Sequence, residues 1–364
     1  MAGTISMSTK FPAELTEEVI DLVRGKSAFA RLSQQIPVAF TGTDIWTFDM
    51  DGEASLVAEN GAKINGGATA GPVNVKPLKL EYGVRVSKEF MTASEERKVE
   101  ILRPFNEGFA RKVARALDMM AIAKVNPRDG QASALIDNDF TEVTNKVLYT
   151  PGNADAAIND AAALIGDFSM TGIALSKTLG SAMGNETNTA GAYKYPELRW
   201  GASPEVLNGI RCEVNGTINK YGTALGIVGD FEAAFKWGYA KDIELEVIPY
   251  GDPDNTGSDL AGHNQVYLRA EAFIGFAMLT KDAFARIETP YAIKYDGNNA
   301  TSGTTADTVG MAGQAVEVAA NGFTKTGKTF SGWNTKADGS GTAYAAGASY
   351  TLTAAGLTLY AQWS

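Results

Sequence analysis

The chain has 364 residues, and 45% of them are hydrophobic, which is enough to build the cores of two or three globular domains. Its 32 basic and 42 acidic residues give a net charge of −10, which argues against a protein that binds nucleic acid by neutralising phosphates. The single cysteine, Cys212, excludes an intrachain disulfide, and the start MAGTISMSTK offers no apolar run for a signal peptide or a membrane span, so we expect a soluble cytoplasmic product.

Residues 1–35 predict an N-terminal arm. They are polar and weakly patterned, apart from a short helix expected over 13–24. Such a segment has little of its own to bury, so its order would come from a neighbouring surface.

A long glycine-rich stretch, Asp49 to Pro77, separates two strand-like segments at 36–48 and 78–87. A connection of this length without a core is unusual in a compact domain, and it indicates disorder, a functional loop or packing against another molecule. We expect an extended two-stranded loop that projects from the body.

The most strongly patterned stretch runs from Thr92 to Val125 and predicts a long helix. Thr92 and Glu95 form a capping box, and Pro104 predicts either a kink or a fresh start of the helix. An apolar face is expected from Phe105, Phe109, Val113, Leu117 and Met120, and a solvated face from Glu107, Arg111, Arg115 and Asp118.

Three further elements are predicted in the body. An alanine-rich helix is expected over 153–166 and a strand at 243–247, and strict alternation over 266–278 predicts a strand of about 45 Å that could follow the long helix. After Pro290 the composition shifts to Gly, Thr, Ser and aromatic residues, with four basic and four acidic residues in 291–364. A separate small β-rich domain is therefore expected at residues 291–364.

Several motifs suggest chemistry, and in each case a structural role fits better. Gly322 to Thr329 satisfies the phosphate-loop pattern, but the sequence after it cannot start the required helix. Acidic loops at 49–52 and 252–257 resemble the start of a calcium-binding loop yet lack the glutamate at its twelfth position. His263 is the only histidine, so a Ser-His-Asp triad would have to use it; we expect an ordinary loop residue there and a buried structural thiol at Cys212. No catalytic residue, metal site or cofactor is predicted.

The order of these elements, together with VRVSKEF at Val84 to Phe90, resembles the major capsid proteins of tailed bacteriophages, which have the Hong Kong 97-type fold. The resemblance implies an α+β fold with an N-terminal arm over 1–35 and a capsid body over 36–289. Within that body it implies an extended loop at 49–77, a spine helix at 92–125, and an axial domain within roughly 150–250 that clusters around five-fold and six-fold positions.

The C-terminal stretch resembles the Listeria-Bacteroidetes surface repeat, a small β-grasp-like module. The resemblance rests on YAIKYD at 291–296, FSGW at 330–333 and TLYAQW at 358–363, with Gly297, Asn298 and Asn299 in place of the usual paired glycines. Its motif residues are Phe330, Gly332, Trp333, Leu359, Tyr360 and Trp363. Trp333 and Trp363 could line a binding site, but we expect core positions.

These resemblances imply a non-enzymatic shell subunit whose hexamers and pentamers form an icosahedral head around double-stranded DNA that is held without sequence-specific contacts. Arm and loop would each lie over a neighbouring copy. Intersubunit contacts are expected at Glu59, Lys63, Asn65, Arg85 and Phe29, with Lys63 also the speculative site of a crosslink. A separate scaffolding protein, a portal and head-completion proteins are further partners, no membrane is expected, and the repeat would decorate the outside of a virion assembled in the host cytoplasm.

Two other interpretations remain open from the sequence. An encapsulin-type compartment shares the fold and would enclose an enzyme rather than DNA. A bacterial surface adhesin would explain the repeat, although the absence of a signal peptide and the single copy of the repeat count against it. A hydrolase is disfavoured because histidine and cysteine are so scarce.

Overall fold

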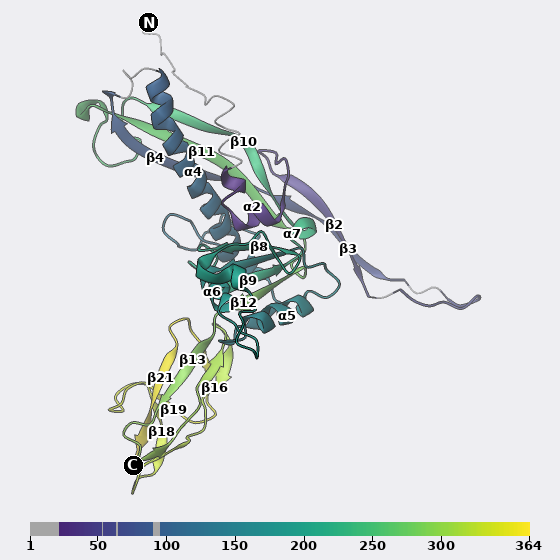
Figure 1. Ribbon diagram of the computed structural model, residues 1–364, viewed down its shortest axis with the longest axis vertical. Helices are drawn as coiled ribbons and strands as arrows, with labels where there is room; N and C mark the ends of the chain where they lie inside the picture. The colour runs from purple at the N-terminus through teal and green to yellow at the C-terminus, as the bar shows by residue number, and fades with distance from the viewer. Residues whose placement is uncertain (1–21, 53, 63–64, 90–94) are drawn as a thin grey trace.

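The computed structural model describes residues 22–52, 54–62, 65–89 and 95–364. Its described elements form an elongated body, a two-stranded extension that projects from it, and a β-rich C-terminal unit at one end of the body (Figure 1). The predicted capping residue Thr92 and most of the predicted helix at 13–24 lie outside the described residues.

The first half of the body is a long sheet packed against one helix. Its strand order is β1 (Gln34–Gln35), β10 (Phe235–Ile248), β11 (Gln265–Met278) and β4 (Pro77–Ser87), with β10, β11 and β4 antiparallel and β1 parallel to β10. Helix α4 (Glu95–Ala123) lies alongside β4 and β11 (Figure 1). The alternation over 266–278 thus marks the central strand of a sheet whose inner face forms the main core.

Helix α4 confirms the predicted spine and most of its apolar face. Phe109, Val113, Leu117 and Met120 are buried in the main core, and Phe105 packs at its edge. The helix runs through Pro104 without a break, so a fresh start there is wrong. It ends at Ala123 because Lys124 takes a left-handed conformation with φ of 56°, before the predicted stop at Asn126.

The described part of the predicted N-terminal arm packs into the body. Residues 22–35 belong to the body: α2 (Ala28–Leu32) begins at the N-cap Ser27 and inserts Ala28, Phe29 and Leu32 into the main core. Short apolar runs such as AFARL carry no marker that separates an arm from a buried turn of helix, which is why periodicity missed this element.

The second half of the body has its own sheet and core. Its strands, in spatial order, are β5 (Lys146–Leu148), β12 (Phe284–Glu288), β9 (Ala224–Gly229), β6 (Gly172–Ser176), β8 (Ile210–Asn215) and β7 (Val206–Leu207). Helices α5 (Ala154–Leu164) and α6 (Lys177–Gly184) and the 3₁₀ turn η2 (Pro196–Gly201) contribute to this second core. Helix α7 (Phe231–Ala234) buries Phe231 and Ala234 in the main core instead, and two further 3₁₀ turns are η1 (Phe140–Glu142) and η3 (Ala261–His263). Strand β10 belongs to the long sheet rather than to this unit, and it is much longer than the 243–247 stretch predicted.

The C-terminal unit starts at residue 291, and its strands share no sheet with the strands described in the body. Its main sheet has the order β15 (Thr308–Gly310), β13 (Tyr291–Asp296), β21 (Leu357–Trp363), β18 (Phe330–Asn334) and β19 (Ala343–Tyr344). Two small pairs complete it: β14 (Ser302–Gly303) with β17 (Phe323–Thr324), and β16 (Ala315–Glu317) with β20 (Ser349–Thr351). Within the described part of the chain, no helix is both long and apolar enough to cross a membrane.

Candidate subunit interfaces

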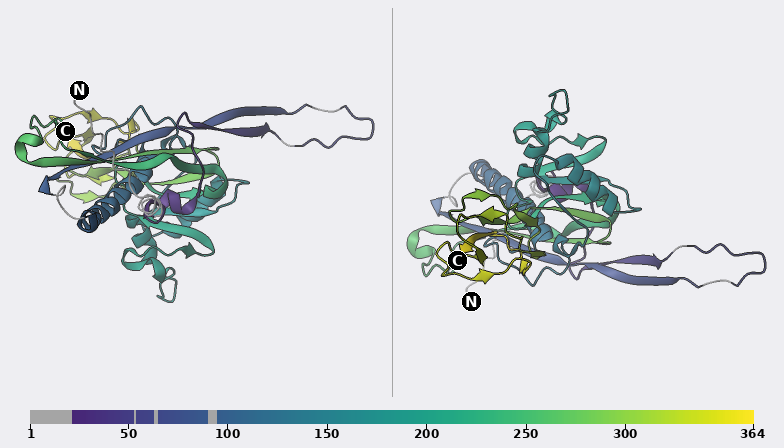
Figure 2. Two further views of the ribbon diagram at one scale, coloured as in Figure 1. Left: turned by 90° about the horizontal axis from the view of Figure 1, so that it is seen from above. Right: turned by 90° about the horizontal axis from the view of Figure 1, so that it is seen from below.

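The projecting extension is an antiparallel pair, β2 (Thr43–Asp51) with β3 (Gly67–Val75). The two-stranded loop predicted over 49–77 includes β3 but only the end of β2, most of which lies in the strand predicted separately at 36–48. It reaches far beyond the rest of the body, and its outer end contains the described residues 54–62 (Figure 2). Among the described residues, β2 and β3 pair only with each other, so both edges of the ribbon are open along its outer part.

One face of the extension is apolar and exposed. Trp46, Phe48 and Met50 occupy alternate positions of β2 and are 74%, 68% and 74% exposed. Opposite them on β3 stand Pro72, Ala70 and Ala68, which continue the same face. A contiguous apolar surface of this kind marks an interaction site, because burying each large side chain is worth about 1.5–3 kcal/mol.

The other face of the ribbon is anchored at its base. Ile45 and Val73 pack against a small cluster formed by Val75 at the end of β3 with Val38 and Ala277 of the body. The turn before β2 uses Gly42 with φ of 94°, where a Cβ would collide with the Asn74 amide. The extension is therefore held at its root while its apolar face stays uncovered.

The predicted contact residues fall in different environments. Glu59 and Asn65 are exposed in the loop tip, and Lys63 lies outside the described residues. Phe29 is 0% exposed and stacks on Phe140 with ring centroids 4.9 Å apart. It belongs to the chain's own core, so its assignment to an intersubunit contact is corrected.

Arg85 is also engaged within the chain. Its guanidinium bonds the carboxylates of Asp252 and Asp254 at 2.7 and 2.5 Å and the backbone oxygen of Ser258 at 2.9 Å. The loop that resembled a calcium site therefore holds a guanidinium, and the pKa of the Asp254 carboxyl is lowered to about 2 by this hydrogen bond. Among the described residues no cluster of acidic, histidine or cysteine side chains is arranged to hold a metal.

A buried carboxylate joins the two halves of the body. Asp118 of α4 was predicted on the solvated face, but it is 0% exposed. It accepts five hydrogen bonds of 2.6–3.3 Å, from Ser27 Oγ, the backbone N–H groups of Ala28 and Phe29, Asn215 Nδ2 and Thr217 Oγ1. Burial raises the pKa of Asp118 to about 6, and the donors partly offset this.

A second acidic residue lies at the same junction. Glu213 of β8 is paired with Arg31 at 2.7 Å and is mostly buried. Burial raises the pKa of Glu213 to about 7, with Arg31 acting in the opposite direction. Sequence patterning gave no sign of either site, because both depend on contacts about 90 residues or more apart in the chain.

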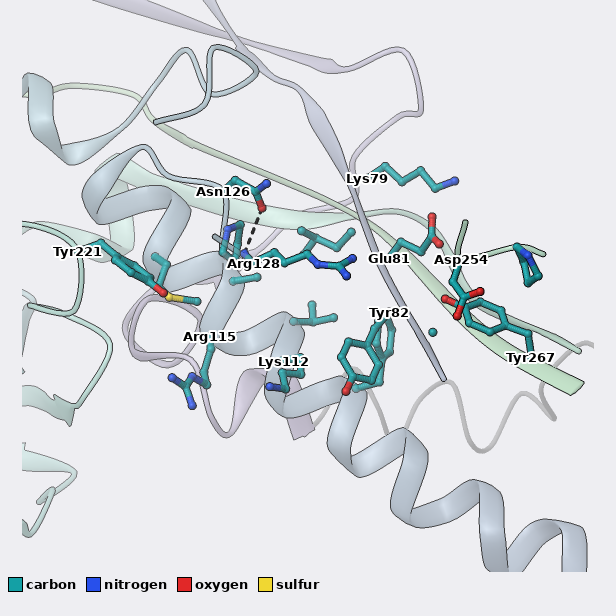
Figure 3. Close-up of a pocket in the computed structure, with 18 of the residues that line it drawn as sticks. Lys79, Glu81, Tyr82, Lys112, Arg115, Asn126, Arg128, Tyr221, Asp254 and Tyr267 are labelled. Carbon is teal, nitrogen blue, oxygen red and sulfur yellow. Dashed lines mark hydrogen bonds between the residues drawn. The ribbon is translucent and has the colours of Figure 1, made fainter. Parts of the chain in front are cut away.

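A groove of about 790 Å³ runs between β4 and α4. Lys112 and Arg115 of α4 line one side, and β4 contributes the consecutive residues 79–83. Figure 3 shows Tyr82 directed toward α4, with Tyr267 and Asp254 on the opposite side of β4. Arg128, Lys220 and Tyr221 extend the lining past the end of the helix.

The C-terminal motif residues build a core. Trp333 and Leu359 are 0% exposed, and Trp333 contacts Tyr295 and Phe330 with ring centroids 4.7 and 5.0 Å away. Trp333 Nε1 donates to the Ala319 carbonyl at 3.0 Å, which satisfies the indole inside this core.

The remaining motif residues shape the strands and the first turn of this unit. Gly332 has φ of 145° at an irregularity between β18 and β21, and Tyr360 and Trp363 are half-buried on β21. Asn298 and Asn299 occupy left-handed conformations, so they supply the turn where paired glycines are usual.

The groups that suggested catalysis have structural surroundings. A strand, β18, follows Gly322 to Thr329 where a phosphate loop needs a helix. His263 Nδ1 lies 3.0 Å from Ser258 Oγ, but Asp259 contacts the ring only through its backbone oxygen, so no triad forms. Cys212 is 1% exposed, and burial raises its thiol pKa to about 12, which makes it unreactive.

Comparison with known proteins gives two family matches that meet at Pro290. The model of the phage capsid family matches residues 11–289, and the model of the Listeria-Bacteroides repeat domain matches residues 291–362. A protein of Evansella cellulosilytica, provisionally named a membrane protein, is 41% identical over 76 residues, which is 20% of this chain and only 11% of that protein.

Solved structures give the same result for the body. A chain from Mycobacterium phage Ogopogo is 30% identical with a TM-score of 0.63, over 72% of this chain and 92% of the other. A chain from Gordonia phage Cozz is 22% identical with a TM-score of 0.59, over 72% and 86%. A capsid chain of a native GTA particle shares the fold at 12% identity with a TM-score of 0.52, over 72% and 89%.

Proposed function

The chain belongs to the phage capsid family and is a major capsid protein of a bacteriophage, and from this premise we propose that many copies close into the icosahedral head of a tailed phage. Family and structural matches favour this function over a cargo-enclosing bacterial compartment and over a surface adhesin.

The observation that carries the proposal is the uncovered apolar face of the β2–β3 extension. A monomer that kept Trp46, Phe48 and Met50 in water would forgo most of the free energy of burying them, and such a ribbon would be a site of aggregation. Packing the face on a sister copy removes both problems. Because the extension projects to one side of the body, each copy can reach the next, and the contact repeats until the assembly closes.

The remaining parts of the chain have places in such a shell. In this proposal the second unit of the body, with its own sheet and core, clusters around the five-fold and six-fold positions of pentamers and hexamers. The C-terminal repeat decorates the outer surface, which suits its separate core and balanced charge. The subunit has no enzymatic role, consistent with the structural surroundings of Cys212 and His263.

The proposed partners follow from this function. Double-stranded DNA would be enclosed without sequence-specific contacts, because the chain's charge of −10 disfavours tight nucleic-acid binding. A separate scaffolding protein, a portal and head-completion proteins would complete the particle in the host cytoplasm.

Electron microscopy and light scattering of the purified protein test the proposal. We expect hollow particles of megadalton mass, with subunits running at monomer size on a denaturing gel unless they are crosslinked. A protein that stays a stable, soluble monomer at high concentration, with its extension folded onto its own body, would contradict it.

A further inference from the structure

The face of the long sheet that is turned away from α4 holds its basic side chains in ion pairs. Lys79 and Arg85 of β4 share this face with Arg269 of β11, because side chains alternate along each strand. Lys79 pairs with Glu271 at 2.7 Å, and Arg269 pairs with Glu246 at 2.5 Å. Arg85 is held by the aspartate loop described above. On this face, carboxylates of the chain itself neutralise these three cations.

The side of the groove formed by α4 is different. It carries four exposed basic residues, two on α4 and two beyond its end: Lys112, Arg115, Arg128 and Lys220. We call these four the cationic patch. Within the described part of the chain, none of them forms an ion pair with a carboxylate. Lys112 and Lys220 lie over the rings of Tyr82 and Tyr221, 5.9 and 4.8 Å from the centroids, which leaves their charges in place.

The acidic residues that line the same groove lie away from the patch. Glu81 belongs to the face of β4 that is turned away from α4, and Arg85 holds Asp254 on that side as well (Figure 3). Positive and negative charges of the lining are therefore separated by β4. The patch is a local concentration of positive charge on a chain whose net charge is −10.

The patch offers little apolar surface to a partner. The apolar residues of α4 in the groove are covered, with Phe109 only 3% and Met119 only 5% exposed. Protein interfaces are usually centred on large side chains that become buried, as the apolar face of β2 would be. A partner that binds the patch should therefore be recognised by negative charge. The phosphate backbone of a nucleic acid fits this requirement better than a protein surface does.

The spacing of the patch suits a row of phosphates. Lys112 and Arg115 are three residues apart, which is about 4.5 Å along a helix axis. Successive phosphates of one DNA strand rise about 3.4 Å along the duplex, and long basic side chains can make up the difference. Arg128 and Lys220 continue the row past the end of α4. Such contacts to phosphates carry no sequence information.

We propose that the cationic patch binds phosphates of the packaged double-stranded DNA, and that this side of α4 faces the interior of the shell. The inference rests on the proposed shell function and deepens it, because it names the residues that meet the DNA. The acidic remainder of the chain repels the duplex, so the contact is local, independent of sequence and sensitive to salt.

Salt dependence tests the patch in free subunits below the assembly concentration. Binding to a fluorescent duplex of random sequence is measured between about 50 and 200 mM salt. Lys112→Gln with Arg115→Gln removes two contacts, so the slope of log affinity against log salt should become shallower by about 1.8. Over that range, wild-type protein should lose about tenfold more affinity than the variant.

A matched control removes two charges elsewhere. Lys146→Gln with Lys177→Gln changes exposed residues outside the groove and should keep the wild-type slope, while circular dichroism checks that all three proteins are folded. Equal slopes in the three proteins, or no binding by wild-type subunits at the lower salt, overturn the proposal.

A photoreactive side chain tests the location in DNA-filled particles. The amino acid p-benzoylphenylalanine replaces Tyr82, which lies beside the patch and is 44% exposed, or Ser364 in the C-terminal unit as the control. After irradiation and denaturation, the probe at position 82 should retain DNA covalently and the probe at position 364 should not. Equal capture at both positions, or none at position 82, contradicts the proposal.

The outcomes separate this proposal from the shell function. If wild-type protein forms no particles, the proposed function fails. If particles form and enclose DNA but the probe at position 82 captures none, only the patch proposal fails. If the Lys112→Gln with Arg115→Gln variant does not assemble while its salt slope equals that of wild type, the patch contacts protein and the proposal is wrong.

Discussion

At the scale of single residues, Asp118 shows how much the body depends on one buried carboxylate. Asp118 lies on α4 and accepts hydrogen bonds from the start of α2, from the end of β8 and from the segment after β8, so it joins the two halves of the body. All of its partners are donors, and a carboxylate is the side chain that satisfies them.

Asp118→Asn should therefore destabilise the subunit by about 2–4 kcal/mol, because the new amide N–H₂ would face other donors. Denaturant unfolding of free subunits below the assembly concentration measures this. Asp160→Asn, an exposed position on α5, is the matched control and should change stability by less than about 0.5 kcal/mol. Equal stability of the two variants would show that the buried network contributes little.

The pH dependence of stability should reflect the raised pKa values at the same junction. A carboxyl with a raised folded-state pKa binds its proton more tightly when folded, so its contribution favours folding at low pH and is lost as pH rises toward that pKa. For Glu213 the window runs from its ordinary pKa of 4.5 to about 7. Glu213→Gln should flatten the fall in unfolding free energy across this window. A slope unchanged from wild type would contradict the assignment to Glu213.

Residue-level detail of this kind was not predictable from the sequence. Helical periodicity placed Asp118 with Arg111 and Arg115 on the solvent-exposed face of the helix. An acidic residue at the border of a wide buried face is expected to be exposed unless its hydrogen-bond partners are known. Phe29 was misassigned for the same reason, since its core partners lie about 110 to 210 residues away.

At the scale of elements, sequence patterns performed much better. Helix α4 and strands β4 and β11 were predicted because long amphipathic repeats carry their own period. Most of β10 was missed because its register is irregular between Tyr239 and Glu244, which interrupts the period of two in the middle of the strand. A two-stranded extension was predicted because the sequence of this region offers no core. Its exposed apolar face was recognised only when the structure gave the register of β2 and β3.

That face should be needed for assembly and not for folding. Trp46→Thr with Phe48→Thr keeps residues that favour strands while removing the apolar surface, so free subunits should stay folded and particle yield should drop at least about tenfold. Light scattering measures the yield of particles, and thermal unfolding shows whether the free subunits stay folded. Leu135→Thr removes an equally exposed apolar side chain elsewhere and should assemble normally. Wild-type yield from the double variant would exclude this face as an interface.

At the scale of the whole molecule, the body and the C-terminal unit are independent. No sheet, hydrogen bond or ion pair joins residues 291–364 to the described part of the body, and the unit has its own core around Trp333. The order of elements was enough to predict the capsid fold, because that order can be read from the hydrophobic pattern of the sequence. Single contacts could not be predicted, because the pattern does not say which distant residues become partners.

Deletion of residues 291–364 should leave particles that assemble with normal size and yield. Electron microscopy of the truncated protein checks this, and the shell surface should be smoother than that of wild type. Complete loss of assembly would show that the repeat takes part in building the shell rather than decorating it.

The direction of the last strand has a practical consequence. Strand β13 leaves the body at Tyr291, and β21 lies beside it in parallel, so the chain arrives at Trp363 on the side of the module remote from its attachment point (Figure 1). A peptide fused after Ser364 would be carried at that remote tip, one per subunit. The particle would then be a scaffold for regular, dense presentation of antigens or enzymes, with the cargo kept clear of the surfaces on which neighbouring copies meet.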